Sequence, residues 1–139
     1  MVSINILSSL KVIGDLSLAG KNVEAQIQLE ALWGKIPSPK ESVLNSYLIV
    51  SYGAVIGLET QNLNTAWEWA RRGLAYSGNF NLMGESEFLA GQVAFARGDI
   101  DTARKYFSLV KKMSGKRLFR SKDIRYAQLV DAVDHRTRK

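Results

Sequence analysis

The 139-residue chain contains no cysteine, one histidine and two prolines. The absence of cysteine excludes disulfides, thiolate metal ligands and cysteine nucleophiles. The single histidine, His135, stands beside Arg136 in a basic segment, so neither a His-based triad nor a multi-histidine metal site can form. With so little proline and no low-complexity tract, a disordered or fibrous protein is disfavoured.

Long apolar runs are also missing. A membrane-spanning helix needs about 18–20 apolar residues, and charged residues such as Lys11 and Asp15 interrupt the best candidate, which lies near the N-terminus. A signal peptide places its positive charge before the apolar run, whereas Lys11 follows it. We therefore expect a cytoplasmic protein that does not enter a membrane.

Motifs for nucleotide binding and acid–base catalysis are absent as well. No G-x-G-x-x-G occurs, and Ser114–Arg117 resembles a phosphate loop only superficially, because Lys111 occupies the place of the required glycine. Glu85 and Glu87 are two residues apart and point to different sides of a helix. We expect no enzymatic activity, no cofactor and no metal site.

The net charge of +6 is concentrated at one end of the chain. Residues 1–110 contain nine Lys or Arg and ten Asp or Glu, whereas residues 111–139 contain ten and three. Such a segment can bind nucleic acid or an acidic partner, or it can be a solvated terminal helix. The predicted basic patch consists of Lys111, Lys112, Lys116, Arg117, Arg120 and Arg125. Its aromatic residues, Phe119 and Tyr126, form no recognised nucleic-acid motif, so any such binding would be weakly specific.

Apolar residues recur at helical spacing along most of the chain, as Phe88, Leu89, Val93 and Ala96 illustrate. We predict seven helices, near 3–19, 21–34, 39–58, 62–77, 82–97, 100–114 and 121–136. Ser38–Glu41 has the pattern of a capping box that starts the third helix. The candidate N-caps are Asn62, Asp99 and Ser121, and the candidate helix ends are Gly20, Gly34, Gly98 and Gly115.

Two parts of the chain begin a helix almost identically. Leu63–Ala66 and Ile100–Ala103 share one pattern, with the alanines 37 residues apart, and an apolar helix precedes each. Those preceding helices contain small pairs, Gly53–Ala54 and Ala90–Gly91. Ala25 is a weaker third instance. Small residues at these places allow the two helices of a hairpin to approach closely.

On these residues the chain resembles tetratricopeptide repeats, which are helix hairpins of about 34 residues. The resemblance implies an all-α fold of three stacked antiparallel hairpins with a right-handed twist and a C-terminal capping helix. We expect one domain over residues 1–139, with repeats near 5–37, 39–77 and 82–115 and an end helix near 117–137. The missing opening tryptophan and the longer spacing depart from the family, and a generic helical bundle is the alternative.

The resemblance implies that a partner protein binds in a groove formed by the first helix of each hairpin. The matching groove positions are Leu48, Ser51, Val55, Glu59, Glu85, Phe88, Gln92 and Phe95. Some relatives hold a terminal carboxylate with a basic clamp, but here those positions are Leu10, Gly14, Tyr52, Glu85 and Leu89. We therefore expect an apolar or mixed peptide or a partner helix, bound by an adaptor, a chaperone or a toxin-neutralising protein.

Three further points complete the sequence-based expectations. Helical spacing favours packing in the core or between repeats over ligand binding for Trp33, Trp67 and Trp69. The end helix should cover the third hairpin with one apolar stripe, because the last repeat of an array has no neighbour. That stripe consists of Tyr126, Leu129, Val130 and Val133. Nucleic-acid binding through residues 111–139 is the alternative function, and self-association stays open.

Overall fold

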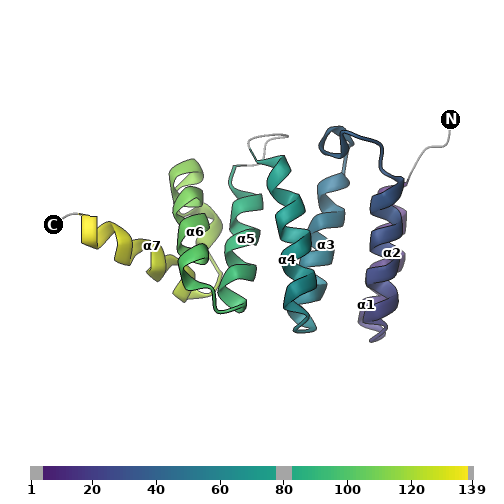
Figure 1. Ribbon diagram of the computed structural model, residues 1–139, viewed down its shortest axis with the longest axis horizontal. Coiled ribbons are helices and arrows are strands. Elements are labelled where there is room, and N and C mark those ends of the chain that lie inside the picture. Colours follow the sequence, from purple (N-terminus) through teal and green to yellow (C-terminus); the bar gives the residue numbers. More distant parts are fainter. Residues whose placement is uncertain (1–4, 78–82, 138–139) are drawn as a thin grey trace. The chain divides into compact units, whose positions relative to one another are not determined.

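The computed structural model describes residues 5–77 and 83–137, with side chains as far as residue 131 in the last helix. This part of the chain is all-α, as predicted, with seven α-helices, three short 3₁₀ helices and no strand (Figure 1). The α-helices are α1 (Ile6–Leu18), α2 (Asn22–Lys35), α3 (Ser46–Glu59), α4 (Leu63–Gly73), α5 (Glu85–Ala96), α6 (Ile100–Ser114) and α7 (Ile124–Thr137). The 3₁₀ helices are η1 (Lys40–Ser42), η2 (Leu74–Tyr76) and η3 (Arg117–Phe119).

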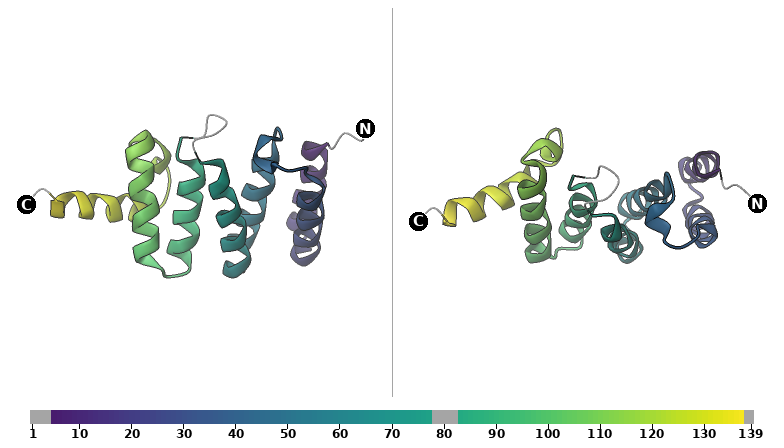
Figure 2. Two further views of the ribbon diagram at one scale, coloured as in Figure 1. Left: turned by 45° about the horizontal axis from the view of Figure 1, so that its top comes forward. Right: turned by 90° about the horizontal axis from the view of Figure 1, so that it is seen from above.

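The chain divides into two compact units, an N-terminal unit (Met1–Ala75) and a C-terminal unit (Tyr76–Lys139). The N-terminal unit contains the hairpins α1–α2 and α3–α4, which stack because α3 packs against both α1 and α2. Within this unit, α1 and α3 lie on one side and α2 and α4 on the other (Figure 2). The C-terminal unit contains the hairpin α5–α6, with α7 packed on α6. The three hairpins and the C-terminal helix agree with the predicted fold.

The three hairpins turn in the same way. After the first helix of each, one residue has a positive φ: Gly20 (81°), Gln61 (60°) and Gly98 (82°). The following residue donates its N–H to the carbonyl five positions earlier, which satisfies a free acceptor at the helix end. These bonds are Lys21 to Leu16 (2.9 Å), Asn62 to Gly57 (2.8 Å) and Asp99 to Ala94 (2.9 Å). The three hairpins therefore share the same turn conformation, although their turns lie in separate stretches of the sequence.

The three recurring alanines occupy equivalent positions after these turns. Ala25, Ala66 and Ala103 are all fully buried, and each donates its N–H to the carbonyl of the residue that follows the positive-φ position. The helices are close here: a Cβ added at Gly57 would lie 2.8 Å from the Cβ of Ala66. The predicted equivalence of Ala66 and Ala103 is confirmed.

The second and third hairpins each hold an aromatic ring over a glycine. A Cβ at Gly53 would lie 2.4 Å from the indole of Trp69, and one at Gly91 would lie 2.6 Å from the ring of Phe107. Trp69 comes three residues after the buried alanine of its hairpin, and Phe107 comes four residues after the corresponding alanine. The position of the glycine relative to that alanine also differs by one residue between the two hairpins. A glycine inside a helix costs about 1 kcal/mol relative to alanine, and here the closely packed ring requires it.

The predicted start of the third helix is wrong. The capping-box pattern at Ser38–Glu41 forms only η1, and α3 begins at Ser46. Lys40 Nζ instead donates to the carbonyls of Trp33 and Ile36, each at 2.7 Å, and so caps the C-terminal end of α2. Ser46 Oγ donates to the carbonyl of Lys40 at 2.7 Å, which fastens the start of α3 to the same segment.

The other helix ends agree in part with those predicted from the sequence. Asp99 caps α6 as predicted, because its Oδ1 accepts the N–H of Thr102 at 3.2 Å. Asn62 occupies the N-cap of α4 without a capping bond from its side chain. Ser121 is a wrong prediction: it lies in the turn with a φ of 62°, and α7 begins after Asp123. Gly34 lies inside α2 rather than at its end.

Candidate functional site

An open hollow lies between α1 and α3 of the N-terminal unit. These two first helices of the hairpins lie on the same side of the unit (Figure 2). Its volume is about 310 Å³. The residues that line it are Gly14, Ser17 and Leu18 of α1 and Ser51, Tyr52, Val55, Ile56 and Glu59 of α3. The hollow is therefore built within one unit, between two successive hairpins.

Three of the four groove residues predicted in the 39–77 repeat, Ser51, Val55 and Glu59, line this hollow. Leu48 lies on the same helix, half-buried and outside the lining. Gly14 and Tyr52 stand at the clamp positions of the resembling family, and that correspondence is the sequence signal that marks them as groove residues. The sequence carries no comparable signal for Leu18 or Ile56.

Three apolar side chains that line the hollow are exposed, and a glycine, Gly14, lies beside them. Leu18 is 89% exposed, Val55 41% and Tyr52 37%. A Cβ added at Gly14 would be in ordinary contact with Tyr52 Cε2, at 3.8 Å, so the Tyr52 ring lies against Gly14. Three apolar side chains on one open surface exceed the scattered single exposures that a protein surface normally shows.

The charge in the lining is negative. Glu59 is its one carboxylate, and Lys and Arg do not contribute to it. Nearby on α1, Lys11 Nζ already pairs with Asp15 at 3.3 Å. Ser17 Oγ donates to Asn22 Oδ1 at 2.9 Å. The hollow therefore offers apolar surface together with one carboxylate, Glu59, that can pair with a positively charged group.

The four groove residues predicted in the third repeat do not form an open groove. Phe88 is 5% exposed, and its ring centroid lies 5.1 Å from that of Phe119 in η3. Phe95 lies 5.2 Å from Tyr126 of α7, and Gln92 shares a hydrogen bond with the Tyr126 hydroxyl. Glu85 pairs with Arg117 at 3.8 Å. The chain's own C-terminal segment thus occupies the surface predicted for a partner.

Tyr126 is the centre of this covering segment. Its ring lies 4.8 Å from Phe107 and 5.9 Å from Phe88, within the range of favourable aromatic pairs. Burial raises the pKa of Tyr126, and the charge of Asp123 adds to the rise. Val130 is buried and Leu129 half-buried. The predicted covering stripe is confirmed for Tyr126 and Val130, and the side chain of Val133 lies outside the described part of the chain.

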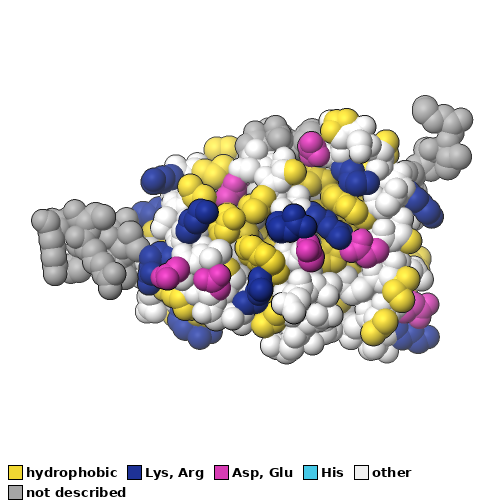
Figure 3. Space-filling model, in the orientation of Figure 1, with side chains coloured by type: hydrophobic (Ala, Val, Ile, Leu, Met, Phe, Trp, Pro, Cys, Tyr) yellow, Lys and Arg dark blue, Asp and Glu magenta, His cyan; other side chains and the backbone are white. Residues whose placement is uncertain are grey.

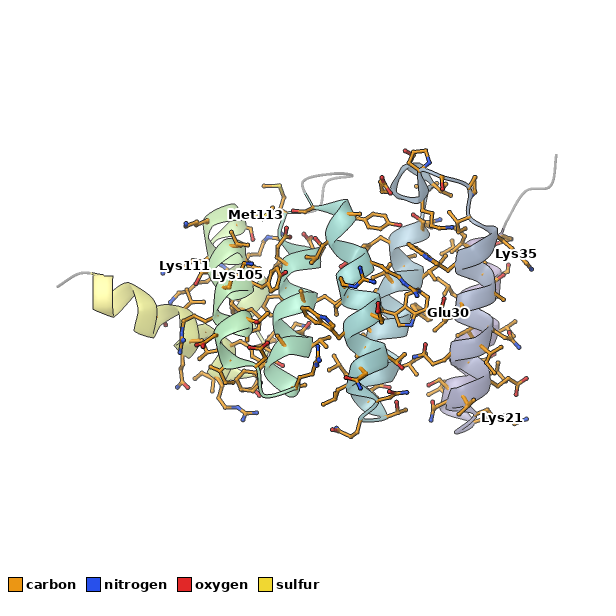
Figure 4. The ribbon with its side chains drawn as sticks, viewed as in Figure 1. Lys21, Glu30, Lys35, Lys105, Lys111 and Met113 are labelled. Carbon is orange, nitrogen blue, oxygen red and sulfur yellow. The ribbon has the colours of Figure 1, made fainter. Side chains whose placement is uncertain are left out.

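Three residues of the predicted basic patch pair with carboxylates in the described part of the chain. The pairs are Lys116 with Asp131 (2.6 Å), Arg117 with Glu85 (3.8 Å) and Arg125 with Asp123 (2.7 Å). The hydrogen bond from Lys116 lowers the pKa of Asp131. Lys112 and Arg120 are exposed, and Lys111 lies on α6 near Met113 (Figure 4). The pairs reduce the positive charge available to a phosphate.

The opposite side of the N-terminal unit is fastened by polar groups. Gln26 Nε2 donates to the carbonyl of Gly53 at 3.2 Å, and Gln26 Oε1 accepts the indole N–H of Trp69 at 2.9 Å. Arg72 pairs with Glu30 at 2.9 Å and lies 4.4 Å over the Trp69 ring. Figure 4 shows Glu30 on α2, between Lys21 and Lys35. These contacts hold the two hairpins together.

The predicted core role of the tryptophans is confirmed for Trp69, which is fully buried and meets the edge of Trp33 at 5.9 Å. Trp33 and Trp67 are half-buried. Beside this pair is a second hollow of about 610 Å³, lined by Asn22, Val23, Gln26, Ile27, Glu30, Thr60, Asn62 and Thr65. The side of the protein seen in Figure 3 mixes apolar, basic and acidic side chains. Gln26 and Glu30, which line this second hollow, take part in the contacts between the hairpins, so we assign these two residues a structural role.

Among the residues whose side chains are described, 5–77 and 83–131, the acidic side chains form no group of three that could hold a metal ion. In the same ranges, each helix is too short or too polar to cross a bilayer. Protein-family models, curated proteins and solved structures were compared with the chain, and none of them matches. Its function therefore has to be inferred from the geometry of these surfaces.

Proposed function

We propose that this protein is a cytoplasmic, non-enzymatic interaction module of tetratricopeptide-like construction, which binds a segment of a partner protein between α1 and α3. The observation that carries the proposal is the open apolar hollow at groove positions of two successive hairpins. Adaptor, chaperone and toxin-neutralising roles all use such a surface. The three equivalent turns and the buried alanines support the tetratricopeptide-like construction.

The shape and chemistry of the hollow favour a protein segment over a small metabolite. Small-molecule sites bury most of their ligand in clefts of about 300–1,000 Å³, and this hollow of about 310 Å³ is at the low end and open. Leu18, which lines the hollow, is largely exposed, and a partner larger than a metabolite would cover it. An amphipathic helix or an extended peptide could place one or two side chains in the hollow and continue along α1 and α3.

The decisive experiment blocks the hollow without disturbing the fold. Gly14→Gln adds a side chain where a Cβ would make only an ordinary contact with Tyr52, and Gly34→Gln makes the same change at an exposed site on α2 where nothing lies within 4 Å. Random peptides displayed on phage are selected on the wild-type protein and then tested on both variants. We expect the selected peptides to bind wild type and Gly34→Gln and to lose binding to Gly14→Gln. Peptides that bind all three proteins equally would contradict the proposal.

Nucleic-acid binding through the basic patch is the second candidate, favoured by the concentration of positive charge in residues 111–139. The ion pairs of Lys116, Arg117 and Arg125 weaken it. A salt series with single-stranded DNA tests this alternative, because phosphate contacts weaken steeply as salt rises. Binding of an apolar peptide between α1 and α3 should change little over the same series.

A further inference from the structure

We infer that the exposed face of α2 pairs with α2 of a second copy of this protein, with the two helices antiparallel about a twofold axis. The hollow between α1 and α3 is lined by residues of those two helices, so this inference concerns a different surface and goes beyond the proposed function. Three features of α2 support it: exposed apolar residues at positions that are polar in the other hairpins, the order of large and small side chains, and the placement of charge.

The first feature comes from a comparison of the second helices of the three hairpins. Two residues before and two residues after its buried alanine, α2 has Val23 and Ile27, which are 78% and 64% exposed. The equivalent positions of the other hairpins are also exposed but polar or charged: Asn64 and Glu68 in α4, and Asp101 and Lys105 in α6. Because the fold accepts polar residues at these positions, its stability does not explain the apolar pair on α2. Neighbouring exposed apolar side chains of this kind indicate a surface that a partner covers.

The second feature is the order of side-chain sizes along this face. Val23, Ile27 and Ala31 are four residues apart and Gly34 follows after three, so these exposed residues share one face of α2. The large residues come first and the small ones last. An antiparallel pair of α2 helices therefore places Ile27 against Ala31 of the second copy, and Val23 against its Gly34. Contacts of a large residue with a small one let two helices approach closely, and a twofold axis makes each contact twice.

The third feature is the placement of charge beside this face. Glu24 and Lys35 are exposed and eleven residues apart, which is three turns of helix, so they lie on the same flank of α2. In the antiparallel pair each Glu24 faces Lys35 of the other copy, whereas a parallel pair would bring like charges together. The midpoints of the three contacting pairs fall within one residue of each other, near Leu29. One twofold axis therefore satisfies the apolar and the charged contacts together.

The other carboxylate close to this axis is neutralised within its own copy. Glu30 pairs with Arg72 at 2.9 Å, and Figure 4 shows Glu30 on the α4 side of α2, with Lys35 pointing to the opposite side. Residues 1–75 contain six Lys or Arg and six Asp or Glu, so the N-terminal unit has no net charge that would oppose pairing.

Sedimentation equilibrium of the full-length protein, from low micromolar to millimolar concentration, tests the pairing. We expect the wild type to show a monomer–dimer equilibrium. Val23→Lys and Asn64→Lys place a lysine at the same position of α2 and of α4, and both sites are exposed. The first variant should weaken the dimer about a hundredfold, because two buried apolar contacts are lost. The second is the matched control and should dimerise as the wild type does.

Charge reversal tests the antiparallel arrangement. Glu24→Lys or Lys35→Glu alone brings like charges together at two places, so each should weaken the dimer about tenfold. The double variant exchanges the two charges and should restore the wild-type equilibrium. Melting temperatures and circular dichroism show whether each variant is folded, and the charge reversals decide the question if Val23→Lys is not.

Three results would overturn the inference. The first is a wild-type protein that stays monomeric at the highest concentration. The second is a dimer that Val23→Lys leaves intact, because that dimer uses another surface. The third is a double charge variant that dimerises as weakly as the single variants, which excludes the antiparallel arrangement.

The two glycine variants separate this inference from the proposed function. Gly14→Gln should lose the selected peptides and keep the dimer. Gly34→Gln should keep the peptides and weaken the dimer, because its new side chain lies where Val23 of the second copy packs. Failure of either surface therefore leaves the other to be judged by its own measurement.

Discussion

Gly14 and Ser17 on α1 stand at the same positions of their hairpin as Gln92 and Phe95 on α5, yet the first pair lines a hollow and the second lies against Tyr126. The backbone turns of the two hairpins agree in the residue with positive φ and in the hydrogen bond that follows it. The turns therefore do not account for the difference, which comes from the segment that follows each hairpin: α3 packs against α1 and leaves a hollow beside it, whereas η3 and α7 lie against Phe88 and Phe95 of α5.

The two units also use different contacts to hold their helices together. In the N-terminal unit, Gln26 and Arg72 connect α2 to the second hairpin through hydrogen bonds, an ion pair and a ring contact. In the C-terminal unit, the rings of Phe88, Phe107 and Tyr126 pack together. The polar contacts of the N-terminal unit lie on its α2 and α4 side, away from the hollow between α1 and α3.

Removal of the C-terminal segment should have the largest effect. Truncation after Gly115 removes η3 and α7 and exposes Phe88 and Phe107, so we expect an aggregating or partly molten C-terminal unit. Near-ultraviolet circular dichroism and the amide signals of α5 and α6 report on this change. Sharp, well-dispersed signals from both helices in the truncated protein would show that the segment is dispensable for packing.

The two glycines under aromatic rings should come next. Gly53→Ala and Gly91→Ala force a methyl group into the ring of Trp69 or Phe107, which should lower the free energy of unfolding by about 1–3 kcal/mol or more. Gly34→Ala is the matched control, because its Cβ meets nothing within 4 Å, and it should stabilise by up to about 1 kcal/mol. Urea unfolding measures all three variants. Equal stability of the three would refute the ring-over-glycine packing.

Much of the fold could be predicted because local signals encode it. Helical spacing predicted seven helices, and the recurrence of Ala66 and Ala103 predicted equivalent hairpins. The start of α3 could not be predicted in the same way. The pattern at Ser38–Glu41 fits a helix start, but Lys40 binds carbonyls at the end of α2, and that contact depends on how the chain folds back.

The candidate site was predictable only in part, for a similar reason. The groove positions that the resemblance implies include Ser51, Val55 and Glu59, which do line the hollow. They also include Phe88 and Phe95, which the chain covers with its own C-terminal segment. Whether a face stays open depends on contacts between distant segments, and spacing within one helix does not contain that information.

Gln26 provides a smaller test of how the N-terminal unit is held together. Gln26→Leu keeps the size of the side chain but leaves the buried indole N–H of Trp69 without its acceptor, so unfolding should become easier by about 1–3 kcal/mol. Gln28→Leu, two residues along the same helix, is the control and should change stability little. A neutral Gln26→Leu would mean that the hydrogen bond from Trp69 to Gln26 is not needed to join the two hairpins.

The pH dependence of the C-terminal unit should give the smallest effect. Burial raises the pKa of Tyr126 above the ordinary value, about 10 for a tyrosine. Below that value the phenol keeps its proton in both states, and the stabilisation is complete. As the pH rises further, the unfolded chain loses the proton first, so stability falls until the folded form also ionises.

Tyr126→Phe isolates this contribution, because it keeps the ring against Phe88 and Phe107 and removes only the hydroxyl. At neutral pH the variant should lose at most about 1 kcal/mol, from the hydrogen bond shared with Gln92. Between about pH 9 and pH 11, its urea midpoint should fall less steeply than that of the wild type. If Tyr126→Phe keeps the wild-type slope, this phenol is not shielded from solvent, and the C-terminal segment then does not cover it as the structure indicates.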